Sequence, residues 1–443
     1  MKEAEASKPW VGLSLMPGGS FRRAVAPLFD AGQVEAVEWS MDIGWAMGKN
    51  FDPWVKAVLQ DYSQRNRLFG HGVLFSPLSA EWQSRQAQWI ESLKQECKQL
   101  RYRHITEHYG FMTIASTTSG CPLPQPHTSG GVKVARERLR MLSKAAGKGV
   151  KGIGLENLAL AMGMQDVLSQ GTMILDIIRA IDEEEYEDEH NEEKEEDEHS
   201  AKTKKTKKNG IMLLDLHNLY CQLWNFGLKS WEEALRLYPL DRVHAIHISG
   251  GSWSYPLSSS DSSTDRPKAF RRDTHDGPVP EVIFEEALPL ALRMCPNVEV
   301  VILERIGNTI QESFNNNDKD EGKDAERLRA DYRRMLDVVK RFREERKAEE
   351  KRKELTAEEN ETEEEKDGEV KKEERVNEVI YEDEELKAYQ NAFIQLFLED
   401  RTPQSILAEL QRRDAFQPFQ DYISSFELPS IEVTASLVKK WVE

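Results

Sequence analysis

Apolar residues recur along most of the chain in short runs that alternate with amphipathic segments. Short apolar runs bounded by turn or helix signals are typical of buried strands, and apolar positions three and four residues apart are typical of helices. The predicted strands span residues 11–15, 34–40, 68–73, 102–111, 150–157, 211–218, 242–250 and 298–305. The predicted helices span residues 21–32, 51–65, 81–100, 133–146, 167–181, 231–237, 282–294 and 324–353. This alternation predicts an α/β protein, a (β/α)8 TIM barrel whose last helix is long and charged.

A doubly wound open sheet is the alternative architecture for such an alternation. That fold usually has a glycine-rich turn directly after its first strand. Residues 16–20, with the sequence MPGGS, match such a turn poorly. The barrel is therefore the favoured prediction.

Two charged segments divide the chain. Residues of about 182–209 are acidic and then basic, and residues 354–385 are rich in Glu and Lys. Segments with so few large apolar residues bury too little surface to become ordered, so we predict that both are disordered. The predicted barrel domain then covers residues 1–353 with the first segment as an insert. Apolar residues return at 386–443, which predicts a small helical module.

The overall composition excludes several classes of partner and location. The 443 residues carry a formal net charge of −18, which argues against nucleic acid as a partner. Four widely spaced cysteines form no CxxC pair, which favours a reducing compartment. No apolar run reaches the ~20 residues that a membrane helix needs, and the N-terminus does not resemble a signal peptide. We therefore expect a cytoplasmic protein without membrane partners.

Potential metal ligands lie at the carboxyl ends of the predicted strands. In a barrel these ends meet at one face, where active sites are found. Asp215 and His217 are two residues apart on a predicted strand and would point to the same face. The polar residues at these ends, ligand candidates together with their neighbours, are His71, Glu107, His108, Glu156, Asn157, Asp215, His217, Asn218, His247, Glu304 and Arg305, with Asp273 and His275 in the loop after residues 242–250. Mixed imidazole and carboxylate ligands suit iron, manganese or zinc better than magnesium.

Each of these residues taken alone has an ordinary structural explanation. A histidine at a strand end is more often a hydrogen-bonded core residue than a ligand, and Glu304 with Arg305 is consistent with an internal ion pair. His104 and His244 are out of phase with the candidate ligands on their strands, so we interpret them as packing or surface residues. The joint pattern favours a metal site. The sequence contains no GxSxG, Walker or HExxH motif for other chemistries.

Seven segments resemble a known family in their order along the chain: GHGV, TEHYGF, GLEN, LLDLHN, IHISGG, DTHDGPVP and LERIGN. They are similar to motifs of the multinuclear non-haem iron-dependent oxidative enzymes. This family includes the methanobactin-forming oxidase and relatives that modify cysteine in ribosomally made peptides. The similarity covers about residues 10–310 and implies a xylose-isomerase-like TIM barrel.

The resemblance also implies roles for individual residues. His71, His108 and Glu156 would be metal ligands from the first half of the barrel. Asp215, His247 and Glu304 would surround a central pair of irons, with Glu156 and Asp215 as the expected bridges. A third ion would use His217 with Asp273 and His275. The expected supporting or substrate-facing residues are Glu107, Asn157, Asn218 and Arg305.

Two positions depart from the family pattern. The family usually has DxNN where this chain has Asp215-Leu216-His217-Asn218, so an imidazole replaces an amide. The family often has HxAGH where this chain has residues 247–251, so the second histidine is replaced by Gly251. The enlarged loop that follows lies on the active-site face and is expected to act as a lid, whereas the insert near 182–209 is expected on the opposite face.

The resemblance therefore implies an oxygen-dependent oxidase that holds two or three irons and modifies a cysteine-containing peptide. A small substrate-delivery protein is an expected partner, and the C-terminal module is a candidate fused substitute for it. One alternative is a redox-neutral zinc or manganese enzyme, such as a sugar isomerase, an epimerase or a hydrolase. The other is a metal-binding protein without catalytic activity.

Overall fold

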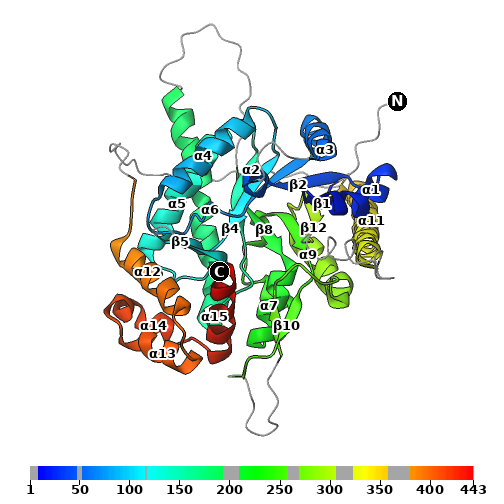
Figure 1. Ribbon diagram of the computed structural model, residues 1–443. Coiled ribbons are helices and arrows are strands. Elements are labelled where there is room, and N and C mark those ends of the chain that lie inside the picture. Colours follow the sequence, from blue (N-terminus) through cyan, green and yellow to red (C-terminus); the bar gives the residue numbers. More distant parts are fainter. Residues whose placement is uncertain are drawn as a thin grey trace.

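A closed barrel of eight parallel strands forms the centre of the protein (Figure 1). The computed structural model describes residues 8–46, 52–114, 117–192, 209–257, 269–305, 323–357 and 380–442. The barrel strands are β1 (Trp10–Leu15), β2 (Ala36–Ser40), β3 (Leu68–Gly72), β4 (His104–His108), β7 (Gly152–Glu156), β8 (Asn209–Asp215), β9 (Val243–Ile248) and β12 (Val300–Leu303). They follow one another around the barrel in chain order, and β12 closes it against β1. The predicted TIM barrel is confirmed.

Helices follow the strands and cover the outside of the barrel. They are α1 (Gly19–Asp30), α2 (Met41–Ala46), α3 (Pro53–Gln64), α4 (Ser84–Cys97), α5 (Ser129–Ala146), α6 (Met164–Glu192), α7 (Leu216–Phe226), α8 (Trp231–Leu235), the turn η1 (Leu240–Arg242), the π-helical turn η3 (Ile283–Ala287), α9 (Leu288–Met294) and α11 (Lys323–Ala357). Helix α6 continues about ten residues beyond its predicted end and includes the first acidic residues of the predicted insert. Residues 193–208 of that insert lie outside the described residues, as do 358–379 of the predicted linker. No helix in the described part of the chain is long and apolar enough to cross a bilayer.

The barrel interior changes from apolar to polar toward the carboxyl ends of the strands. A separate apolar cluster inside the barrel contains Trp10, Ala36, Phe69, Leu213, Ala245, Val300 and Ile302. Side chains on the same side of a strand are two residues apart. The next inward positions on five of these strands are therefore Glu38, His71, Asp215, His247 and Glu304. The strand pattern alone thus places a polar layer directly above an apolar floor.

Two hairpins that the sequence did not predict extend from this face. Strands β5 (Phe111–Ile114) and β6 (Thr117–Leu123) pair directly after β4. Strands β10 (Ser252–Ser254) and β11 (Phe270–Arg272) pair after β9, within the segment predicted to be a loop. Residues 258–268 between β10 and β11 lie outside the described residues. The prediction that this loop acts as a lid falls largely on them and stays a prediction.

The C-terminal helices pack against the barrel beside the first hairpin, where Figure 1 shows them in orange and red. They are α12 (Glu384–Leu398), α13 (Pro403–Arg412), the turn η4 (Asp414–Phe419), α14 (Gln420–Ile423) and α15 (Leu428–Val442). Their buried side chains, including Tyr389 and Phe393, are continuous with the main hydrophobic core of the barrel. The predicted helical module is thus packed on the barrel by a shared core, and its status as a separate domain stays a prediction.

Candidate metal centre

The first group of potential ligands comes from three neighbouring strands. His71, His108 and Glu156 each provide an atom within 4.8 Å of the other two. His71 Nε2 lies 3.2 Å from Glu156 Oε2, and His108 Nε2 lies 3.4 Å from the same oxygen. Each residue ends its strand or lies next to its end, so the register of β3, β4 and β7 brings them together.

The second group joins the other half of the barrel to the same carboxylate. Glu156, Asp215, His247 and Glu304 also provide atoms within 4.8 Å of one another. His247 Nδ1 lies 3.1 Å from Glu304 Oε2, 3.5 Å from Glu156 Oε1 and 4.0 Å from Asp215 Oδ2. Because Glu156 belongs to both groups, the arrangement suits two ions bridged by one carboxylate.

Several of these atoms are buried without a hydrogen bond. They are His71 Nε2, Glu156 Oε2, Asp215 Oδ2 and His247 Nδ1. Buried polar atoms almost always have a partner, and a buried ionised carboxylate without one is costly. Imidazole nitrogens and carboxylate oxygens directed at one point are the donor set of iron, manganese and zinc sites. The residues present therefore fit a metal centre.

Other buried groups hold the ligands in place. His71 Nδ1 lies 3.0 Å from Thr106 Oγ1, and His247 Nε2 lies 2.8 Å from Glu38 Oε2. A carboxylate or hydroxyl on one ring nitrogen leaves the lone pair of the other nitrogen available to a metal. Glu38 is the main residue that the sequence analysis missed. The sequence signal that could have identified it is an acidic residue two positions after Ala36 on a predicted strand, and therefore on the same face of that strand.

Asp215 is fixed by Asn157 from the neighbouring strand. The Asp215 amide donates to Asn157 Oδ1 at 2.7 Å, and Asn157 Nδ2 donates to the Asp215 carbonyl at 3.0 Å. Asn218 Nδ2 donates to the Asn157 carbonyl at 2.8 Å. Asn157 and Asn218 therefore hold the backbone at Asp215 and at the end of β7 in place.

The charges in the centre shift the pKa values of its members. Burial lowers the pKa of His71, but the Glu156 carboxylate outweighs burial and raises it to about 9. Burial raises the pKa of Asp215 well above its usual value, and the carboxylates of Asp273 and Glu156 raise it further. Burial raises the pKa of Glu304, but His275 and His247 outweigh it, so the pKa lies well below its usual range. Without metal, His71 and Asp215 therefore retain protons that a bound cation would displace.

The prediction that Asp215 and His217 share a strand face is wrong. Strand β8 ends at Asp215, and α7 begins at Leu216. The Asp215 Oδ1 atom accepts a hydrogen bond from the Asn218 amide at 2.6 Å, which is the N-cap that starts the helix. His217 therefore lies in the first turn of α7, and its Nδ1 is 2.9 Å from Asp273 Oδ1.

Asp273 and His275 lie next to the second ligand group. His275 Nε2 is 2.5 Å from Asp273 Oδ2, and its Nδ1 is 3.3 Å from Glu304 Oε2. His217, Asp273 and His275 do not form a convergent group of three in the described part of the chain. His275 is thus connected to the centre through Glu304, whereas the His217 ring contacts Asp273 and Arg271.

Glu107 and Arg305 have structural contacts. The Glu107 carboxylate accepts hydrogen bonds from the Phe75 amide at 2.6 Å and the Ser76 amide at 3.1 Å. Burial raises the pKa of Glu107 to about 8. The Arg305 guanidinium donates to the Gly277 carbonyl. Both residues therefore brace the loops around the centre.

A third convergent group lies at the opposite end of the barrel and contains His104, His244 and Glu299. Glu299 is paired with Lys8 and with Arg103, whose Nη2 lies 2.8 Å away. Burial lowers the pKa of His104 and lowers that of His244 to about 4, so both rings are neutral. Two cations already balance the single carboxylate, which agrees with the packing role expected for these histidines.

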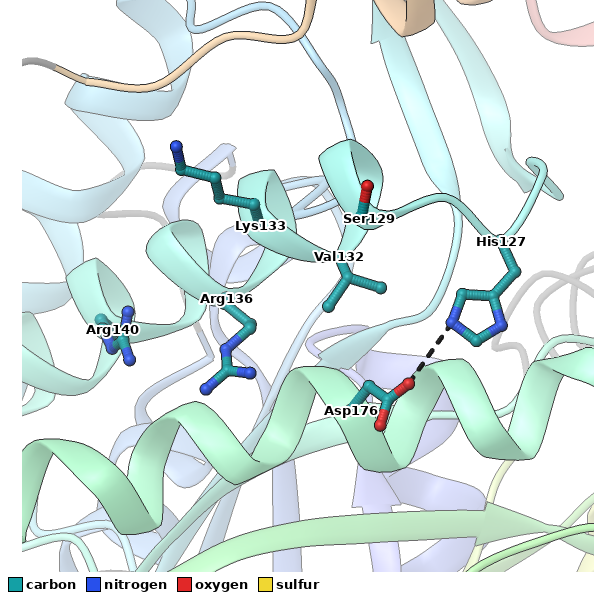
Figure 2. A pocket seen from close by; sticks show the side chains of 7 residues that line it. All are labelled: His127, Ser129, Val132, Lys133, Arg136, Arg140 and Asp176. Atoms are coloured by element: carbon teal, nitrogen blue, oxygen red, sulfur yellow. Dashed lines mark ion pairs between the residues drawn. The ribbon is translucent and has the colours of Figure 1, made fainter. Parts of the chain in front are cut away.

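A surface cavity of about 580 Å³ lies between α5 and α6, away from the ligand groups. Figure 2 shows Lys133, Arg136 and Arg140 along α5, with His127 facing Asp176 across the cavity. His127 Nε2 lies 3.4 Å from Asp176 Oδ2. With only one carboxylate and no convergent donors, this cavity does not resemble the centre in the barrel.

A family model matches the part of the chain that contains the ligand candidates of the later strands. The model described as "RiPP precursor modification enzyme MbnB/TglH/ChrH" matches residues 185–313, less than a third of the chain. RiPPs are ribosomally synthesised and post-translationally modified peptides. The matched segment contains Asp215, His247, Asp273, His275 and Glu304, whereas His71, His108 and Glu156 precede it.

Solved structures resemble the chain only distantly. An L-ribulose 3-epimerase covers 76% of this chain and 97% of its own, with a TM-score of 0.39 and 12% identity. A zinc-bound IolI protein covers 75% and 99%, with a TM-score of 0.43 and 13% identity. A xylose isomerase-like TIM barrel protein from Mycobacterium smegmatis, in complex with magnesium, covers 74% and 98%, with a TM-score of 0.38 and 12% identity. No curated protein matches the sequence. The resemblance to the RiPP-modifying family that the motifs predicted is confirmed for residues 185–313.

Proposed function

We propose that the protein is an oxygen-dependent oxidase that holds at least two non-haem iron ions and modifies a cysteine-containing peptide. The observation that carries this proposal is the shared Glu156 carboxylate, which lies between two convergent groups of buried ligands. The match to a family of peptide-modifying enzymes supports a peptide as the substrate. His71, His108, Glu156, Asp215, His247 and Glu304 would hold the ions. When bound, the iron would activate dioxygen, which takes up the electrons that the peptide loses.

The side chains of the centre differ in exposure, which indicates where the peptide approaches. His71, Glu156, Asp215 and His247 are at most 2% exposed. His108 is 23% exposed, and Glu304 and His275 are 13% and 14% exposed. The peptide therefore reaches the centre on the side of His108, Glu304 and His275. The buried ligands exclude water from the other side.

Metal content tests this proposal directly. Protein purified without oxygen is analysed for its elements and by Mössbauer spectroscopy. Two or more irons per chain with antiferromagnetic coupling, together with oxygen consumption that depends on a cysteine-containing peptide, are expected. Protein that binds zinc or manganese tightly and consumes no oxygen would instead be a redox-neutral enzyme, because the same donors suit those metals. A folded, metal-bound protein with no turnover would support a binding role.

A peptide library in which cysteine is replaced by serine provides the matched control for the substrate. The proposal predicts oxygen uptake with the cysteine peptides alone. Equal uptake with both libraries would contradict the proposed thiol chemistry while leaving the metal centre intact. A separate substrate-delivery protein, if required, would appear as a factor that restores turnover to the metal-loaded chain.

A further inference from the structure

Both ring nitrogens of His217 are engaged by other side chains. The ring is buried, and Nδ1 lies 2.9 Å from Asp273 Oδ1. On the other side, Nε2 lies 3.1 Å from Nε and 2.9 Å from Nη2 of Arg271. His217 thus links a carboxylate to a guanidinium within the protein.

The chemistry of these partners decides where the His217 proton lies. A guanidinium is always protonated and only donates, so Nε2 must accept with its lone pair. A neutral imidazole has one lone pair, so Nδ1 carries the proton and donates it to Asp273. Burial lowers the pKa of His217, which agrees with a neutral ring. Neither nitrogen then has a lone pair left for a metal.

The Arg271 side chain is built into this position. It is 5% exposed. Its guanidinium lies over the rings of Trp253 and Tyr220, 5.0 Å and 5.6 Å from their centroids. Its backbone is fixed as well, because its amide donates to Asn225 Oδ1 at 2.8 Å and Asn225 Nδ2 donates to its carbonyl at 2.9 Å. A cation held by stacking and strand contacts is a fixed part of the site.

The two departures from the family pattern meet at this point. A Cβ atom at Gly251 would lie 2.6 Å from His217 Cε1 and 2.2 Å from the Arg272 carbonyl oxygen. Any side chain at position 251 would therefore collide with the His217 ring. The absence of a side chain at position 251 therefore leaves the space that the His217 ring occupies.

We propose that Arg271, whose guanidinium donates to His217 Nε2, leaves His217 without a lone pair for a metal, so that this centre takes two metal ions and no third. The observed juxtaposition places a permanent positive charge against Nε2 of His217, one of the residues that the resemblance implied as ligands of a third ion. The charge of His275 and the hydrogen bond from His217 hold the pKa of Asp273 at about 2 against burial. This inference rests on the proposed metal centre and specifies its stoichiometry.

The test compares metal content in the full-length wild-type protein and in Arg271→Met, both loaded with excess Fe(II) without oxygen and then desalted. Methionine keeps the apolar stem but removes the charge and the donors. The His217 proton can then move to Nε2, which frees Nδ1 beside Asp273. We expect two ions per chain in the wild type and one more in Arg271→Met. Arg272→Met is the matched control, since Arg272 contacts Ser252 instead, and it should contain as many ions as the wild type.

Three ions in the wild type, or equal counts in the wild type and Arg271→Met, would overturn the inference. A wild-type protein that binds no metal would contradict the proposed function. The inference is tested by the difference in metal content between the wild type and Arg271→Met. If Arg271→Met does not fold, the test is instead made on the metal-loaded wild type, by measuring the ¹⁵N chemical shifts of the His217 ring. A protonated Nδ1 and an unprotonated, metal-free Nε2 are expected, and a metal-shifted nitrogen would overturn the proposal.

Discussion

Glu38 and His247 lie on opposite halves of the barrel sheet, yet the Glu38 carboxylate is 2.8 Å from His247 Nε2 inside the barrel. This contact fixes the ring so that Nδ1 faces Glu156, Asp215 and Glu304. Carboxylates behind a metal-bound histidine orient its ring and increase its basicity. Glu38 is therefore a positioning residue for the proposed centre.

Replacing Glu38 with Leu removes the acceptor behind His247. We expect metal affinity to fall by about 10–100-fold, the usual effect of losing such a partner. Competition with a fluorescent chelator measures this affinity. Glu38→Gln, which keeps an acceptor oxygen, should lose less. Unchanged affinity in Glu38→Leu would show that His247 does not depend on this contact.

Asp215→Asn tests the carboxylate that faces His247. Asparagine is as good an N-cap as aspartate, so α7 and the fold should be retained. The charge that faces the ions is lost, and we expect the protein to lose at least one ion and its activity together. Elemental analysis and a thermal unfolding curve measure the two effects. Asp241→Asn, whose side chain is 74% exposed, is the control. Full metal content in Asp215→Asn would remove this residue from the centre.

Gln390 fastens the C-terminal helices to the barrel. Its Oε1 accepts from the Ala80 amide at 2.9 Å, and its Nε2 donates to the Leu78 carbonyl at 2.8 Å and to Gln125 Oε1 at 2.7 Å. Gln390→Ala leaves these buried groups unpaired, which should lower the free energy of unfolding by about 1–3 kcal/mol. Urea denaturation measures the loss. Gln395→Ala, on the exposed face of the same helix, should change stability by less than about 0.5 kcal/mol.

Asp166 makes the stability of the packed C-terminal helices depend on pH. Its Oδ1 lies 2.6 Å from the Tyr422 hydroxyl, and burial raises its pKa from 3.8 to about 7. The folded state therefore binds this proton more tightly than the unfolded state. The stabilisation that the protonated Asp166 side chain contributes is complete below about pH 4 and is lost as pH rises through about 7.

Metal-free wild-type protein should therefore lose about 3 kcal/mol more stability between pH 5 and pH 8 than Asp166→Asn does. Urea denaturation at several pH values measures both slopes, and the other titrating groups cancel in the comparison. Parallel curves for the two proteins would show that Asp166 titrates normally in the folded state.

Much of the centre could be predicted from the sequence because β-strands have a fixed period. Apolar runs set the strands, and parallel strands of a barrel bring their carboxyl ends to one face. His71, His108, Glu156, Asp215, His247 and Glu304 were therefore expected together, and the structure brings them together. The acid at Glu38 followed the same period, but it lies within a strand instead of at its end.

Only the tertiary structure decided where the strands end and which side chains from distant parts of the chain come into contact. The apolar residues after Asp215 are compatible with either strand or helix, and the N-cap contact of Asp215 with the Asn218 amide starts α7 there. Arg271 contacts His217 although the two residues are 54 positions apart in the chain. The contact depends on the β10–β11 hairpin, which has no local sequence signal. Periodicity determines the face of an element on which a residue lies. Contacts between elements also depend on loop paths and on the space available, as the collision between His217 and a side chain at position 251 shows.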